Sequence, residues 1–221
     1  MLALLGSQAA APCYSRAQNC VSFLKTRKPL TMRVIAGTAK GARLEAPKGR
    51  KTRPTLDRVR EALFSILGAK VADARVLDLY AGTGAIGIEA LSRGAAYCEF
   101  VENDAECIAH LQRNLEAARV ESRAKIRRLR LPDDLSRLGR TEKKYDVIYA
   151  DPPFDFADYP LLCSELVRND LLRPDSIVII EHDARTSLAE CPAGLVCFRQ
   201  AHYGKTFLSF FIAGETRPET Q

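Results

Sequence analysis

Short apolar runs alternate with amphipathic segments through most of the chain. Apolar runs bounded by glycine, proline or charged residues predict buried strands. The predicted strands are Ala74–Tyr80, Tyr97–Glu102, Lys125–Leu129, Tyr145–Ala150, Ser176–Glu181, Leu195–Arg199 and Thr206–Ile212. Apolar residues spaced three and four apart predict helices instead. The predicted helices in this region are Ala85–Arg93, Asp104–Ala118 and Tyr159–Val167.

The order of these elements indicates the fold class. Strand and helix alternate through most of the chain up to Glu181, and repeated units of this kind form a parallel sheet with helices on both faces. The last two predicted strands follow each other without a helix, so they predict a hairpin and one antiparallel strand. The sequence therefore predicts an α/β fold with a doubly wound, Rossmann-like sheet that is mostly parallel.

A further helix is expected before the first strand of the series. Apolar residues with helical spacing predict it over Leu56–Leu67, with Thr55 as its N-cap and Gly68 at its end. Arg58 and Arg60 fall outside the apolar face of this helix. We expect both arginines to point towards solvent.

The segment around the start of this helix is strongly basic. Residues 25–60 carry 12 lysines and arginines against two acidic residues, which gives +10, whereas the whole chain carries +6. A basic element joined to a mildly acidic remainder is typical of a polyanion-binding surface, although a solvated charged loop has the same composition. Within this segment Met32–Ile35 and Ala42–Glu45 predict a small hairpin.

Composition divides the chain into four parts. Residues 1–31 mix alanine, serine and cysteine with scattered basic residues and contain no acidic residue, which indicates either an organelle transit peptide or an extension before a start at Met32. Residues 32–70 form the basic N-terminal element, 71–215 the α/β domain and 216–221 a tail.

No apolar run approaches the roughly 20 residues that cross a bilayer. We expect a monomer in the cytoplasm, or in a chloroplast or mitochondrion if the leader is a transit peptide.

Cysteine usage indicates neither a disulfide framework nor a structural zinc site. The seven cysteines are an odd number and include no C-x-x-C pair. Cys98 and Cys107 fall in apolar patterns and are expected to be core residues. No metal is expected in the site.

A glycine-rich turn follows the first strand of the series. Gly82, Gly84 and Gly87 allow a sharp turn and a close approach of a ligand to the backbone. Asp78 lies near the end of that strand, and Glu102 ends the next one. In a doubly wound sheet this position lets Glu102 accept hydrogen bonds from a ribose diol. The pattern predicts a nucleotide-like cofactor and leaves a nicotinamide dehydrogenase open.

The tetrapeptide Asp-Pro-Pro-Phe follows the strand Tyr145–Ala150. Two prolines cannot continue a central strand, so the chain has to leave the sheet in a stiff, extended loop. Asp151 and the carbonyl of Pro152 are two acceptors that hold the hydrogens of an exocyclic base amine, and the ring of Phe154 stacks on the base. This chemistry indicates methyl transfer to an amino nitrogen.

The chain resembles the RsmD-type small-subunit ribosomal RNA guanine-N2 methyltransferases over roughly Met32 to Ile212. The matching segments are M-R-V-I-A-G from Met32, T-R-P-T-L-D-R-V-R-E-A-L-F from Thr52, D-L-Y-A-G-T-G-A-I-G-I-E-A-L-S-R-G-A from Asp78, V-E-N-D from Val101, D-P-P-F from Asp151 and Y-G-K-T-F-L-S-F-F from Tyr203. The resemblance implies a class I methyltransferase fold, S-adenosylmethionine as cofactor, and small-subunit ribosomal RNA or an assembling small subunit as partner.

The resemblance also implies three groups of site residues. The cofactor is expected at Asp78, Tyr80, Gly82, Gly84, Gly87, Glu102 and Asn103. The target guanine is expected at Asp151, Pro152 and Phe154. RNA is expected to contact Arg43, Arg50, Lys51, Arg53, Arg58 and Arg60.

Two positions depart from the family pattern, and several other functions remain open. The acidic residue expected near the adenine is replaced by Arg128-Leu129-Arg130-Leu131-Pro132-Asp133-Asp134, which leaves the adenine contact open. Lys205 stands where an acidic residue is expected. The alternatives are an amino-group methyltransferase acting on DNA adenine or on a protein glutamine, a nicotinamide oxidoreductase, and a non-catalytic RNA-binding protein of ribosome assembly.

Overall fold

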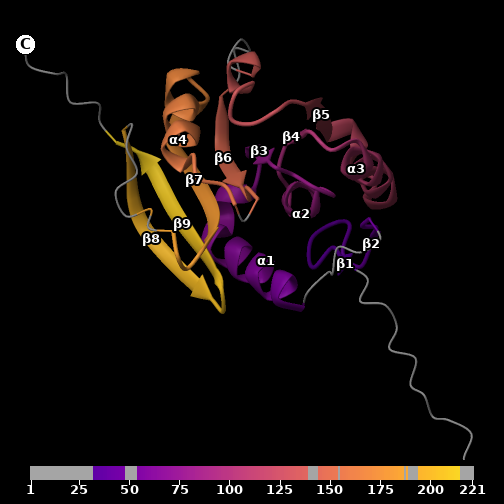
Figure 1. Ribbon diagram of the computed structural model, residues 1–221. Coiled ribbons are helices and arrows are strands. Elements are labelled where there is room, and N and C mark those ends of the chain that lie inside the picture. The colour runs from indigo at the N-terminus through magenta and orange to yellow at the C-terminus, as the bar shows by residue number, and fades with distance from the viewer. Residues whose placement is uncertain are drawn as a thin grey trace, which may run out of the picture.

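The computed structural model describes residues 32–47, 54–138, 144–153, 155–186, 188 and 194–214. A seven-stranded sheet crosses the molecule, with helices on both of its faces (Figure 1). Its strand order is β5-β4-β3-β6-β7-β9-β8. The strands are β3 Arg75–Leu79, β4 Tyr97–Glu102, β5 Ala124–Arg128, β6 Tyr145–Ala150, β7 Leu172–Asp183, β8 Leu195–Tyr203 and β9 Thr206–Ala213.

The predicted fold class is confirmed. The pairs β3–β4, β3–β6, β4–β5 and β6–β7 are parallel, whereas β9 is antiparallel to both β7 and β8. One strand, β9, therefore runs against the others, as the absence of a helix between the last two strands predicted. The order reverses between β3 and β6, and ligands bind at such switch points in open α/β sheets.

Two apolar layers enclose the sheet. The helices α1 Pro54–Leu67, α2 Ala85–Ser92 and α3 Ala105–Ala118 cover one face, and α4 Tyr159–Arg168 covers the other (Figure 1). Strand residues alternate between the layers, so that Val147 and Tyr149 of β6 face α1 and Ile148 and Ala150 face α4. The continuous apolar runs of the central strands follow from burial on both sides.

The N-terminal hairpin is confirmed and packs against two of the helices. β1 Met32–Arg33 pairs antiparallel with β2 Arg43–Leu44. The carboxylate of Glu89, fully buried on α2, accepts hydrogen bonds from Ile35 N at 2.7 Å and Ala36 N at 2.9 Å. These bonds satisfy backbone donors that a two-residue strand leaves unpaired, and they attach the hairpin to the helix that begins at the glycine turn.

Asn114 attaches the segment after the hairpin to the glycine turn. This α3 residue is buried, and its amide oxygen accepts from Glu45 N at 2.7 Å. Its amide nitrogen donates to Glu45 O at 3.0 Å and to Thr83 O at 2.9 Å. One side chain therefore ties the segment after the hairpin to the loop between β3 and α2.

Several predicted boundaries change. α1 begins at Pro54, so Thr55 lies inside its first turn and is not the N-cap; proline suits this position because its missing N–H has no partner in a first turn. β7 begins at Leu172, where Arg173 N donates to the hydroxyl of Ser176 across an irregular register. Cys98 and Cys107 are buried core residues, as predicted, whereas Cys163 is disulfide-bonded.

Candidate functional site

The glycine turn and the Asp-Pro-Pro corner lie at the same edge of the sheet. Leu79, the last residue of β3, pairs in parallel register with Ala150, the last residue of β6. Asp151 N donates to Leu79 O at 3.4 Å. The loop that follows each strand therefore begins at the same level, and we call this level the carboxyl edge. The parallel sheet predicted from the sequence thus brings both loops to one edge.

The backbone of the glycine turn requires left-handed conformations. Tyr80 has φ +58°, Gly82 +55° and Gly84 +81°. Gly84 precedes α2, and a Cβ there would lie 2.2 Å from Leu111 Cδ1. A Cβ at Gly87 would lie 2.2 Å from Phe100 Cε1, whereas one at Gly82 would meet nothing within 4 Å. Gly84 and Gly87 therefore let α2 pack closely, and Gly82 leaves space in front of the turn.

Asp78 fixes the start of α2 from inside the sheet. Its side chain is buried, and Oδ2 accepts a hydrogen bond from Gly87 N at 2.9 Å. Burial raises the pKa of Asp78 to about 7; the bond from Gly87 opposes this rise and the charge of Glu102 adds to it. A carboxyl group with this pKa changes its charge close to neutral pH.

Glu102 closes the other side of the glycine turn. One carboxylate oxygen accepts from Gly82 N at 2.7 Å, and the other accepts from Asn103 N at 2.7 Å and Asp104 N at 2.9 Å. The side chain is half-buried and Asn103 is exposed. These bonds hold the carboxylate in place at the end of β4, and further lone pairs of both oxygens remain for hydroxyl donors.

This arrangement fits S-adenosylmethionine. Glu102 offers fixed acceptors for a ribose diol at the strand next to β3, and the space in front of Gly82 lets the ligand approach the backbone. The hydroxyl of Tyr80 is buried and has no hydrogen-bond partner among the residues that the structure describes. It is a further polar group available to a ligand at the same turn.

The Asp-Pro-Pro corner presents an exposed acid on a buried support. Asp151 is exposed and Pro152 is buried. Phe156 N donates to Pro153 O at 2.9 Å, which closes the turn after the corner. The corner thus holds Asp151 outward at the carboxyl edge. Phe154, the residue expected to stack on the base, lies outside the described residues.

The structure places the ring of Phe156, which the sequence did not single out, behind the corner. The half-buried ring of Phe156 lies 5.7 Å from the ring of Tyr80 and 4.9 Å from that of Tyr159. Beyond Tyr159 the rings of His182, Phe207 and His202 continue the contacts along the carboxyl edge. Phe156 therefore joins the glycine turn to the Asp-Pro-Pro corner by direct ring contacts.

Another missed pair lies beside the corner. The hydroxyl of Tyr149 donates to the carboxylate of Glu181 on the neighbouring strand β7. Burial raises the pKa of Glu181, and the bond from Tyr149 opposes this rise. Glu181 ends the apolar run of β7 in the sequence, as Glu102 ends that of β4, and this shared position was the available signal.

The basic residues expected to contact RNA do not all lie on the surface. Arg43 and Arg58 are exposed. The outward orientation expected for Arg60 is wrong, because its side chain is only 2% exposed. Its guanidinium donates to Arg33 O at 2.6 Å and to Asp57 at 3.0 Å and lies 3.7 Å from Glu89. A buried arginine needs such partners, so Arg60 joins α1 to the hairpin and α2. Arg50, Lys51 and Arg53 lie outside the described residues.

Comparison with known proteins assigns the chain to a family. The family model described as Conserved hypothetical protein 95 matches residues 32–212. The chain is 35% identical to YlbH of Bacillus subtilis over 81% of its own length and 98% of the relative. It is 30% identical to the ribosomal RNA small subunit methyltransferase D of Escherichia coli over 79% of its length and 86% of the relative. This chain belongs to the Conserved hypothetical protein 95 family.

The fold agrees with a solved structure of similar sequence. The chain is similar to the putative methyltransferase yhhF from Escherichia coli, with a TM-score of 0.72 and 29% identity over 83% of this chain and 98% of that one. The family resemblance drawn from the sequence motifs is thereby confirmed. The region matched by the family model begins at Met32 and includes the N-terminal hairpin, β8 and all of β9 except its last residue. Among the residues described, no helix has the length and apolar character needed to cross a membrane.

Proposed function

We propose that this member of the family transfers the methyl group of S-adenosylmethionine to the exocyclic N2 of a guanine in small-subunit ribosomal RNA. The observation that carries the proposal is the parallel pairing of β3 and β6, which brings the glycine turn and Asp151 to one edge. The names of the relatives, including a ribosomal RNA small subunit methyltransferase, support the RNA substrate.

The residues of the Asp-Pro-Pro corner perform the chemistry by positioning. S-adenosylmethionine supplies an electrophilic methyl group, so neither a metal nor a covalent nucleophile is needed. The lone pair of a base amine is delocalised into the ring, which makes the nitrogen a poor nucleophile. Asp151 and the Pro152 carbonyl accept its two hydrogens and favour the pyramidal form. Transfer of the methyl group would break its bond to the sulfonium sulfur, with S-adenosylhomocysteine as the leaving group, and form the N–C bond. The nitrogen would then release one proton, which the Asp151 carboxylate would accept.

The remaining basic surface serves to hold RNA. Arg43 and Arg58 are exposed, and in the sequence they flank the basic segment that contains Arg50, Lys51 and Arg53. Phosphate contacts from such residues position RNA without selecting a base. A stacked and paired guanine cannot present its amine to Asp151, so the target base has to leave its stack before reaction.

Methylation of ribosomal RNA tests this function directly. Purified protein is incubated with labelled S-adenosylmethionine and with either free 16S-type ribosomal RNA or small subunits from cells that lack the gene. Digestion to nucleosides and mass spectrometry are expected to show N2-methylguanosine at one position. N6-methyladenosine as the product, or the absence of any methylated nucleoside, would contradict the proposal. Calorimetry with NADH in place of S-adenosylmethionine distinguishes the oxidoreductase alternative.

A further inference from the structure

Glu181 lies one strand away from Asp151 at the carboxyl edge. β6 and β7 are parallel, and Ala150 pairs with Ile180 in their register. Asp151, the first residue after β6, and Glu181, which lies within β7, each follow these paired residues by one position, so their backbones lie about 4.8 Å apart, the spacing of neighbouring strands. Tyr149 and Ile179 both face the α1 layer. By the alternation of strands, Asp151 and Glu181 are placed towards this same side of the sheet.

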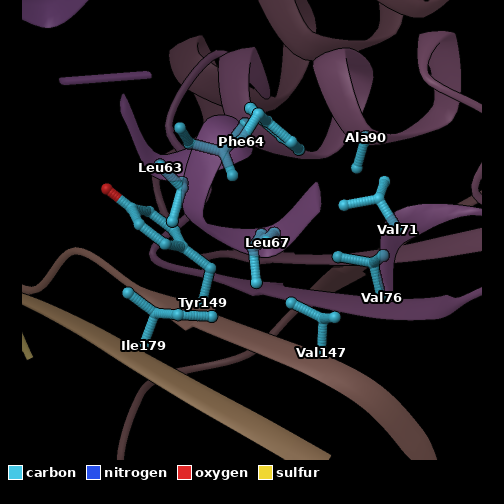
Figure 2. A pocket seen from close by; sticks show the side chains of 10 residues that line it. Leu63, Phe64, Leu67, Val71, Val76, Ala90, Val147, Tyr149 and Ile179 are labelled. Atoms are coloured by element: carbon cyan, nitrogen blue, oxygen red, sulfur yellow. The ribbon is translucent and has the colours of Figure 1, made fainter. Parts of the chain in front are cut away.

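The hydroxyl of Tyr149 holds the carboxylate of Glu181 in place. The ring of Tyr149 packs among Leu63, Phe64 and Ile179, and Figure 2 shows its hydroxyl pointing away from the other lining side chains. This hydroxyl donates to Oε2 of Glu181. Burial, followed by the charges of Glu181 and then Asp151, raises the pKa of Tyr149. Glu181 therefore contacts this phenol group directly, and the charge of Asp151 acts on it.

The other oxygen of Glu181 is available to a ligand. In the described part of the chain, no other hydrogen bond to this carboxylate is found. Its Oε1 atom is also not one of the fully buried side-chain atoms that lack a hydrogen-bond partner. The side chain is half-buried. A partly desolvated acceptor without a second donor is unfavourable in the free protein, and a donor from a substrate would relieve this cost.

We propose that Glu181 accepts a hydrogen bond from N1–H of the target guanine and thereby selects guanine over adenine. The proposal rests on the proposed function, because it requires a base amine at Asp151. Guanine presents N1–H and the N2 amine side by side, so two neighbouring acceptors match its Watson–Crick edge. Adenine presents a lone pair at N1, and a carboxylate opposite that lone pair would repel it.

The test compares two bases that both carry the 2-amine. Ribosomal RNA is assembled by ligation with either guanosine or 2-aminopurine ribonucleoside at the mapped target position. 2-Aminopurine keeps the nucleophilic amine but has an acceptor at N1. Single-turnover methylation by the parent protein is expected to be at least about 100-fold slower with 2-aminopurine, because a site built for a donor strongly rejects its loss.

The variant Glu181→Gln decides the role of the carboxylate. The amide of the new side chain still accepts from Tyr149 and can donate to N1 of 2-aminopurine. We expect the preference for guanosine over 2-aminopurine to fall at least 10-fold, with the binding of S-adenosylmethionine unchanged. Glu116→Gln, on the exposed surface of α3, is the matched control and is expected to retain the preference.

Two outcomes overturn the proposal and are distinguishable. If Glu181→Gln slows both substrates by the same factor, Glu181 acts only through the structure and the assignment fails while the proposed function stands. If the parent protein methylates no guanine N2 in natural ribosomal RNA, the proposed function itself fails. Because the first result is a ratio of rates within each variant, a partly unfolded preparation does not alter it.

Discussion

Replacement of Asp78 by Asn is predicted to change how the stability of the protein depends on pH. Asp78 is buried, and its pKa lies near 7 instead of the ordinary 3.8. The folded protein therefore keeps a proton on this carboxyl group between about pH 4 and 7, whereas the unfolded chain releases it. Stability from this group is present at low pH and is lost as pH rises through the folded pKa.

The size of the effect follows from the shift. Each pH unit in which the folded state alone holds the proton changes the free energy of unfolding by about 1.4 kcal/mol. Between pH 5.5 and the folded pKa near 7, the parent protein is expected to lose about 2 kcal/mol from Asp78 ionisation. Asn does not titrate, and its amide oxygen can still accept from Gly87 N.

Urea unfolding of parent and Asp78→Asn proteins at pH 5.5 and pH 8.0 measures this difference. The free energy of unfolding of Asp78→Asn minus that of the parent is expected to be about 2 kcal/mol higher at pH 8.0 than at pH 5.5. Other titrating groups, including Glu181 and His182, are shared by both proteins and cancel in the comparison. A parent–variant difference that is the same at both pH values would show that Asp78 is ionised throughout and refute the reasoning.

Two further predictions concern the ion pair beneath the hairpin and the basic surface. Glu89→Gln leaves the buried guanidinium of Arg60 without its counter-ion on α2, and we expect urea unfolding to show a loss of about 3 kcal/mol. Glu116→Gln, at an exposed position, should change stability by less than about 0.5 kcal/mol, and equal effects would contradict the role of the pair. Replacing exposed Arg43 and Arg58 with Ala should weaken the salt dependence of RNA binding. The slope of the logarithm of the association constant against the logarithm of the salt concentration should become less negative by about 1.4. An unchanged slope, or the same reduction in an Arg168→Ala control on α4, would place the RNA elsewhere.

The sheet was predictable because each strand carries its own local pattern. The bounds of β4 and β6 agree with the prediction, since burial on both faces makes these strands continuous apolar runs between polar ends. β8 extends to Tyr203 instead of Arg199, because its second half is polar. An edge strand has one partner and an exposed face, so its pairing leaves little trace in hydrophobicity.

The parts of the site that were missed depend on residues far apart in the sequence. Arg60 lies outside the apolar stripe of its helix, and the burial of its guanidinium depends on Glu89 and on the hairpin. Glu89 itself is the only charged residue of α2, which was a usable signal for a buried partner. The bond between Tyr149 and Glu181 joins two strands separated by a helix, and no local period encodes it.

The glycine turn and the acidic strand ends were predictable for the opposite reason. Their chemistry is set by short motifs that follow strands, and parallel strands bring all such motifs to one edge. Asp78, Glu102 and Asp151 therefore came together once the strand order was known. The sequence alone could not show that backbone N–H groups already donate to both carboxylate oxygens of Glu102.

The most direct test of the central claim separates cofactor binding from methyl transfer in one variant. Asp151→Asn is compared with the parent protein by calorimetry with S-adenosylmethionine and by single-turnover methylation of the ribosomal RNA substrate. If Asp151 holds the target amine beside the glycine turn, the affinity for S-adenosylmethionine stays within about twofold, and the methylation rate falls about 100-fold or more. Methylation at the parent rate by Asp151→Asn would contradict the account.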